Sequence, residues 1–193
     1  MQMPSIDWEA YWKEKASSYK TINERNLIAS KMVGTGKKVL DVGCGHGELM
    51  DLLKPNNNVI GMDFNMKMIE ENLKKESKVV WGTAEDIPFP NEHFDAVCAL
   101  GLIEYLSSYK YFINEVHRVL KPKGTAIISF RNSLFSKWSG SEHEPERKSY
   151  DPDKVSFPNF RIDELKFFHE HLPHKVEDPK YYHSGFIIKM VKT

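Results

Sequence analysis

Short apolar runs alternate with amphipathic stretches along most of the chain. The apolar runs predict strands at 38–42, 59–63, 79–81, 94–100 and 125–130. Between them, apolar side chains recur every three or four residues, most clearly from Tyr109 to Leu120, where Lys121-Pro122-Lys123-Gly124 forms a typical helix stop. This order predicts a doubly wound α/β fold, in which helices cover both faces of a parallel sheet and ligands bind beyond the carboxyl ends of its strands.

Shorter helical stretches fit the same scheme. One is expected around 49–53, and Asn65 is placed to cap another that carries Met66, Ile69 and Leu73. At the amino end, a helix is indicated by aromatic and small residues at intervals of three and four, namely Trp8, Tyr11, Trp12, Ala16 and Tyr19.

The carboxyl-terminal third has a different character. Residues 133–160 are rich in Ser, Pro and charge, which is typical of a long functional or mobile connection. Residues 161–172 predict a last helix, with Leu165, Phe168 and Leu172 in register. The runs 175–177 and 185–191 predict two edge strands joined by a short turn. We therefore expect one domain with a helical cap (1–33), a core (34–132), an insertion on the substrate side (133–160) and a last helix with an edge hairpin (161–193).

Composition narrows the function classes. The chain has 193 residues, with 27 basic and 27 acidic side chains and no formal net charge. This balance argues against a surface that binds nucleic acid or an anionic membrane through its net charge. Its apolar runs fall short of the roughly 20 residues of a membrane span, and its start resembles no secretory signal. Cys44 and Cys98 lack the spacing of a disulfide framework or metal site, so we expect a cytoplasmic protein.

The strongest local signal is the run Val39-Leu40-Asp41-Val42-Gly43-Cys44-Gly45-His46-Gly47, a strand that leads into glycines and then a helix. Glycines permit a tight turn and the close approach of a ligand, and the first amides of the helix suit an anionic group. A tight turn without a ligand is the alternative. A dinucleotide fold would need glycine where Glu48 stands, which disfavours a nicotinamide oxidoreductase.

This run resembles the first motif of class I S-adenosylmethionine-dependent methyltransferases. Further segments are similar to that family's later motifs in the expected order: Asp63 after the second strand, then the ranges 82–89, 94–106 and 115–125. The resemblance covers about residues 35–132. It implies a Rossmann-like, seven-stranded and mostly parallel sheet with an antiparallel last strand, S-adenosylmethionine as cofactor and S-adenosylhomocysteine as product.

The resemblance also implies roles for individual residues. The glycines would line the methionine part of the cofactor with support from Asp41, and Asp63 would hold the ribose. His46 either touches the ligand or is a spectator between glycines, and Tyr11 or Tyr19 of the cap either contacts the cofactor or faces the core. The full set of cofactor-binding candidates is Tyr19, Asp41, Gly43, Cys44, Gly45, His46, Gly47, Asp63, Phe64, Met68, Thr83, Ala84, Glu85, Asp86, Leu100, Gly101 and Tyr105.

The acceptor is less constrained. The fourth strand ends Ala99-Leu100-Gly101-Leu102, without the Asn/Asp-Pro-Pro-aromatic segment that the family uses on amino groups of nucleic acids. We expect a small-molecule acceptor that is methylated on oxygen or nitrogen, and a monomer or homodimer that contacts neither nucleic acid nor membrane. A non-catalytic, S-adenosylmethionine-binding regulatory protein is the alternative.

Proton-accepting candidates near the acceptor are Glu104, Tyr105, His143 and His183. The segment 131–138, with Arg147, Lys148 and Tyr150, either folds over a polar substrate or is an ordinary loop. His169 and His171 are two residues apart and do not share a helix face, so we interpret these two and His174 as surface or hinge residues and not as a metal site.

Overall fold

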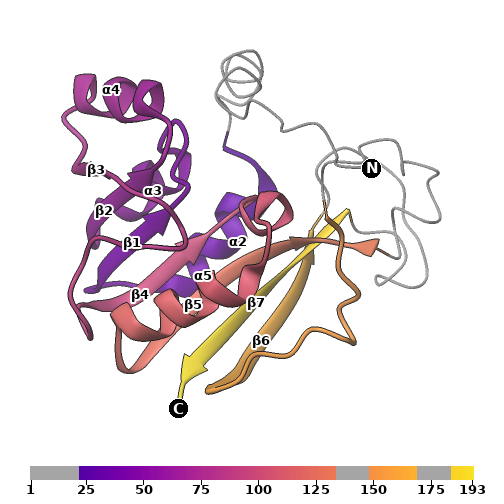
Figure 1. Cartoon of the computed structure of the whole chain (residues 1–193). Helices are drawn as coiled ribbons and strands as arrows, with labels where there is room; N and C mark the ends of the chain where they lie inside the picture. Colours follow the sequence, from indigo (N-terminus) through magenta and orange to yellow (C-terminus); the bar gives the residue numbers. More distant parts are fainter. Residues whose placement is uncertain (1–21, 134–147, 169–183) are drawn as a thin grey trace, which may run out of the picture.

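A computed structural model describes residues 22–133, 148–168 and 184–193. Figure 1 shows helices packed on a twisted sheet, and the elements follow the alternation of the sequence. In chain order they are α2 (Glu24–Val33), β1 (Lys38–Val42), α3 (Glu48–Leu53), β2 (Asn58–Asp63), α4 (Met66–Lys74), β3 (Val79–Trp81), β4 (Phe94–Ala99), the 3-10 helix η2 (Ile103–Tyr105), α5 (Tyr109–Val119), β5 (Leu120–Arg131), β6 (Phe160–Phe168) and β7 (Gly185–Lys192).

The sheet has seven strands in the order β3-β2-β1-β4-β5-β7-β6. The first five strands run parallel to their neighbours, while β7 is antiparallel to both β5 and β6. This confirms the predicted Rossmann-like sheet with an antiparallel last strand. The carboxyl ends of β1, β2, β3, β4 and β5 therefore meet at one edge, which is where such a sheet binds ligands.

Two apolar layers enclose the sheet, because successive residues of a buried strand point to opposite faces. On one face, Leu40 of β1 and Ile128 of β5 pack with Phe112 and Val116 of α5. On the other face, residues of the same strands pack with α2 and α3, namely Val39, Ile127, Ala29, Met32, Leu49 and Leu53. The strands are thus buried on both sides, as their continuous apolar runs predict.

The helix α4 packs against β2 and β3 at the end of the sheet (Figure 1). Asn65 caps it as predicted, since the Asn65 side chain accepts a hydrogen bond of 3.0 Å from the Lys67 amide. The buried face differs from the expected stripe: Met66 and Leu73 are half exposed, whereas Met68, Ile69 and Asn72 are buried. The helix is therefore turned so that a polar residue, Asn72, faces inward.

The predicted helix at 161–172 is wrong over its described part, because residues 160–168 form strand β6. The sequence misleads because Leu165 and Phe168 are three residues apart, a spacing that also occurs in helices. In strand β6 the two residues point to opposite faces, so that Leu165 is 40% exposed and Phe168 is buried. A smaller difference is that β5 begins at Leu120, which pairs with Phe94 of β4.

Several expectations fall outside the described residues: the amino-terminal helix up to residue 21, most of the segment 131–138, Arg147, the end of the predicted last helix, the strand at 175–177 and the triplet His169, His171 and His174. Within the three described ranges, no helix has the length and apolar character needed to cross a bilayer. Cys44 and Cys98 are both free and buried.

Candidate active site

The glycine run forms a tight loop after β1. Gly43, Gly45 and Gly47 have φ angles of 70°, 53° and 86°, a region that side chains other than glycine rarely adopt. The amides of Gly43 and Cys44 both donate to the carbonyl of Met62, over 2.8 and 3.0 Å, so the loop turns across the end of β2. A Cβ added at Gly45 would meet no atom within 4 Å in the described part of the chain, so space is open above the loop.

Asp63 lies at the end of β2 and is bonded to this loop. Its Oδ2 accepts a hydrogen bond of 2.9 Å from the Gly45 amide, and its Oδ1 accepts one of 2.9 Å from the Asn65 amide. Burial raises the pKa of Asp63, while these backbone donors oppose the rise. The Phe64 amide also donates to this carboxylate. A carboxylate has about four lone-pair sites, so it can still accept from a further donor.

A second acid, Asp41, lies beneath the loop at the end of β1 and is only 3% exposed. Burial, followed by the charges of Glu48 and Asp63, raises the pKa of Asp41 to about 8, and the charge of Arg25 opposes this rise. Burial also raises the pKa of Glu48. The loop therefore lies over carboxyl groups whose ionised form is disfavoured by burial. A cation bound beside them would favour the ionised form again.

The segment after β4 closes the other side of the loop. A Cβ added at Gly43 would lie 3.3 Å from Leu102, and the Gly101 amide donates over 2.8 Å to the Ser129 hydroxyl of β5. Arg25 of α2 lies so close to Gly101 that an added Cβ there would be 2.7 Å from its Nη1. The predicted pair Leu100 and Gly101 is thus brought beside the glycine loop.

Five of the predicted cofactor-binding residues follow β2 and β3, namely Phe64, Thr83, Ala84, Glu85 and Asp86. The side chain of Phe64 is exposed, and its carbonyl accepts a hydrogen bond of 2.8 Å from Trp81 Nε1. Thr83 and Asp86 pair in an isolated bridge, with Ala84 partly buried between them. Glu85 is exposed and accepts from the Ser107 hydroxyl over 3.3 Å. Met68, in contrast, is only 5% exposed, so its side chain lies within the protein.

The proton-accepting candidates Glu104 and Tyr105 form η2. Glu104 is 3% exposed, and its carbonyl accepts a hydrogen bond of 2.9 Å from the Lys148 amide. Burial and then the charge of Glu104 raise the pKa of Tyr150 to about 12. The Tyr150 hydroxyl donates to the Ile103 carbonyl over 3.4 Å. Tyr105 is partly buried. His143, His183, Tyr11 and Tyr19 lie outside the described residues.

Five polar residues near the loop were not among the predicted site residues: Arg25, Glu48, Glu71, Asn72 and Lys75. Arg25 and Glu48 adjoin Asp41, while Asn72 and Glu71 reach the loop from α4. A signal existed for Asn72, because it follows Met68 by four residues and so shares a helix face with it. Within the described ranges, His, Cys, Asp and Glu form no group of three or more that suits a metal ion.

Comparison with known proteins gives a family match over the same residues. Residues 40–128 match the methyltransferase domain family. An uncharacterised protein of Methanocaldococcus jannaschii is 36% identical over 132 residues, which cover 67% of this chain and 51% of that protein. The demethylmenaquinone methyltransferase of Staphylococcus carnosus is 35% identical over 112 residues, which cover 53% of this chain and 46% of that enzyme. The chain thus spans about half the length of these relatives.

The whole fold has a counterpart among solved structures. A chain from the complex between the Haloferax volcanii Trm112 methyltransferase activator and a methyltransferase superimposes with a TM-score of 0.78. The superposition covers 98% of this chain and 99% of that one, with 16% sequence identity. At this level of identity the likeness concerns the fold.

Proposed function

We propose that this chain transfers a methyl group from S-adenosylmethionine to an oxygen or nitrogen of a small molecule, because residues 40–128 match the methyltransferase domain family and the chain has the sheet of that fold. The observation that carries the proposal is the hydrogen bond of 2.9 Å between the Gly45 amide and Asp63. It brings together the two features that the family uses for opposite halves of the cofactor.

The residues at the edge fit that cofactor in chemical type. Asp41, buried among other acids, would face the ammonium group, and Asp63 would accept from the ribose hydroxyls with its remaining lone pairs. The exposed Phe64 ring and the segment 83–86 would surround the adenine. Leu100 and Gly101 would lie near the sulfur. When bound, S-adenosylmethionine supplies an electrophilic methyl group on a sulfonium.

Methyl transfer is an in-line displacement, so the first task of the protein is to position the acceptor. An oxygen or ammonium acceptor must also lose a proton. We assign this task to Glu104, which lies in η2 after Gly101 and is 3% exposed, with Tyr105 as the second candidate. A relative that methylates demethylmenaquinone supports the small-molecule class of acceptor.

Calorimetric titration with S-adenosylhomocysteine tests the site. We expect Asp63→Ala to weaken binding about ten- to a hundredfold, because it removes a carboxylate bonded to the ligand. The matched control is Asp163→Ala, which changes the same residue type in β6 at the opposite end of the sheet and should leave affinity unchanged. Wild-type protein that fails to bind, or Asp63→Ala that binds as tightly as wild type, would contradict the proposal.

Turnover separates an enzyme from a protein that only binds the cofactor. Incubation with methyl-labelled S-adenosylmethionine and a metabolite extract should place label on a compound of low molecular mass. Glu104→Gln should reduce the initial rate of methyl transfer, because we propose that Glu104 takes a proton from the acceptor. Its affinity for the cofactor should stay within about twofold of the wild-type value. Label on nucleic acid, or no labelled product beside tight cofactor binding, would overturn the proposed acceptor class or the activity.

The structural relative from Haloferax volcanii was solved with an activator protein. We propose that this chain is a monomer or homodimer by itself, and that a small activator is the partner to test. Light scattering during gel filtration measures the first, and the labelling rate with an added activator of the same source measures the second.

A further inference from the structure

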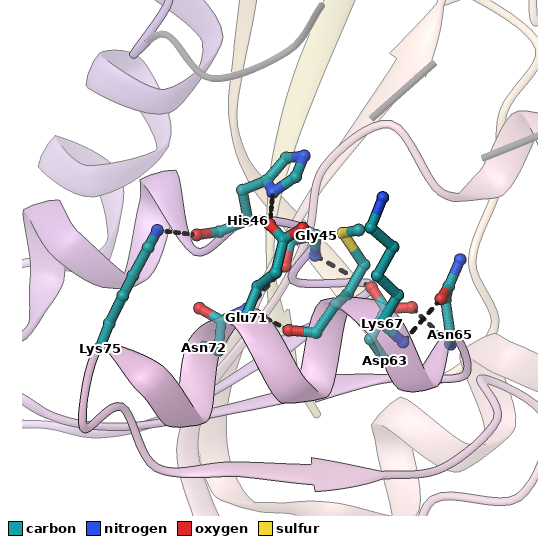
Figure 2. A network of polar contacts seen from close by, with 9 residues as sticks. Gly45, His46, Asp63, Asn65, Lys67, Glu71, Asn72 and Lys75 are labelled. Carbon is teal, nitrogen blue, oxygen red and sulfur yellow. Dashed lines mark hydrogen bonds and ion pairs between the residues drawn. The ribbon is translucent and has the colours of Figure 1, made fainter. Parts of the chain in front are cut away.

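The carbonyls of Gly45 and His46 are held by a segment from a different part of the chain, helix α4 and the residue that follows it. Asn72 of α4 donates to the Gly45 carbonyl over 2.7 Å, and Lys75 Nζ, just after the helix, lies 2.7 Å from the His46 carbonyl. Nδ1 of His46 lies 2.7 Å from Oε2 of Glu71. Figure 2 shows these three side chains reaching from one helix to the loop, while Asp63 accepts from the Gly45 amide.

The buried position of Asn72 lowers the stability of the protein, so packing alone does not explain a polar residue there. Its side chain is fully buried, and its Nδ2 also donates to the Met68 carbonyl over 2.8 Å. Within the described residues its Oδ1 has no partner, and a buried polar atom without one lowers stability. An apolar residue would avoid this cost but would supply no donor to Gly45.

Asn72 also constrains the shape of the loop sterically. A Cβ added at Gly47 would overlap with Asn72 Oδ1, so the side chain closes the space beside the last glycine. The loop is thereby fixed at Gly45 by hydrogen bonds to its amide and its carbonyl, and at Gly47 by contact.

We propose that Asn72 and Glu71 are positioning residues for cofactor binding: α4 holds the glycine loop in the form that receives the methionine part of the ligand. The inference rests on the proposed function. It concerns the amino-acid half of the ligand only, because the contacts of α4 fall on Gly45 and His46 and not on the segment 83–86.

Two ligands distinguish positioning from a merely structural role. S-adenosylhomocysteine carries the amino-acid part, and 5′-methylthioadenosine lacks it. Calorimetry should show that Asn72→Leu, which removes the donor at similar volume, weakens S-adenosylhomocysteine about tenfold and methylthioadenosine less than about threefold. A general loosening of the fold would weaken both ligands equally, and that result overturns the inference.

A second variant keeps the test valid if Asn72→Leu does not fold. Glu71 is 26% exposed, so its replacement is better tolerated. Glu71→Ala should weaken S-adenosylhomocysteine about fivefold, whereas Glu71→Gln keeps an acceptor for His46 and should stay within about twofold. The neighbouring exposed Glu70→Gln is the matched control and should bind as wild type does.

The outcomes separate the two proposals. Wild-type protein that binds neither ligand overturns the proposed function, and this inference with it. Wild-type protein that binds both ligands, together with unchanged affinities in Asn72→Leu and Glu71→Ala, overturns only the positioning role.

Discussion

Asp41 illustrates how a single side chain links the site to pH. Its carboxyl is buried beside Glu48 and Asp63, and its pKa is raised to about 8. At pH 7 it is therefore mostly protonated in the free protein. A cation bound beside it favours the ionised form and lowers the pKa, so binding of the cofactor's ammonium group expels a proton.

We predict that S-adenosylhomocysteine binding at pH 7 releases about one proton, because the Asp41 carboxyl ionises on binding. Titrations in phosphate and in Tris, whose ionisation enthalpies differ, measure this release as a difference in observed enthalpy. Affinity should rise between pH 6 and pH 8. Asn at position 41 (Asp41→Asn) has no proton to lose, so equal proton release in that variant would contradict the assignment.

The residues of the loop differ in how far sequence could predict them. Gly43, Gly45, Gly47 and Asp63 were predictable because their role depends on backbone conformation and local order along the chain. Asn72 depends on which face of α4 turns inward, and the apolar residues Met66 and Leu73 pointed to the wrong face. Its partner, the Gly45 carbonyl, is 27 residues away, and no local pattern encodes that contact.

At the scale of elements, the start of α4 lies next to the candidate site. Asn65 is 4% exposed and follows Asp63 by two residues, so one turn both caps the helix and presents the acid. The cap thus helps to place α4 against the loop.

We predict that Asn65→Ala lowers the free energy of unfolding by about 0.5–2 kcal/mol, the usual cost of a lost cap. Asn65→Asp keeps the accepting oxygen and should cost less than Asn65→Ala. Urea denaturation followed by circular dichroism measures both. Equal losses in the two variants would show that the cap bond contributes nothing.

A second pair of side chains ties α5 to the loop between β3 and β4. Glu115 accepts from the Ile87 amide over 2.9 Å, and Arg118 donates to the carbonyls of Ile87 and Phe89 over 2.8 and 2.7 Å. Hydrogen bonds from Arg118, and then from the Ile87 amide, lower the pKa of Glu115. This loop carries the segment 83–86, so the pair supports the residues that we propose to surround the adenine.

We predict that Glu115→Gln destabilises the protein by about 1.5–3 kcal/mol at pH 7, the range for a hydrogen bond to a charged group. Because folding lowers the pKa of Glu115, its contribution is present above the unfolded value of about 4.3 and is lost as the pH falls through the folded value. The difference from wild type, measured by urea denaturation at pH 7, 5 and 4, should therefore shrink toward pH 4. Glu70→Gln is the control for the loss of one charge. A difference in the free energy of unfolding between wild type and Glu115→Gln that does not change with pH would contradict this explanation.

The order of elements was largely readable because apolar strands buried on both faces and amphipathic helices have different periods. Strand β6 could not be predicted in this way, because it is an edge strand in which Ile162 and Leu165 are exposed at 47% and 40%. Its bulge also disturbs the alternation of apolar and polar residues. Edge strands carry the weakest pattern, since only part of their surface is buried.

For the whole molecule, the expected signature of function is stabilisation by ligand. We predict that S-adenosylhomocysteine at about a hundred times its Kd stabilises the chain by about 2.7 kcal/mol, which raises Tm by roughly 5–11 °C for a protein of this size. Differential scanning fluorimetry measures the shift, which should be reduced in Asp63→Ala. A shift with NADH in place of S-adenosylhomocysteine would instead favour a nicotinamide enzyme.

The double hold on Gly45 has a consequence for engineering. Its amide is bonded to Asp63 and its carbonyl to Asn72, and both lie in the next strand–helix unit. A chimera that transplants only residues 38–53 into another scaffold would carry all three glycines but leave both anchors behind. We therefore expect that only a transplant of the whole stretch from Lys38 to Lys75 keeps the loop together with both of its anchors.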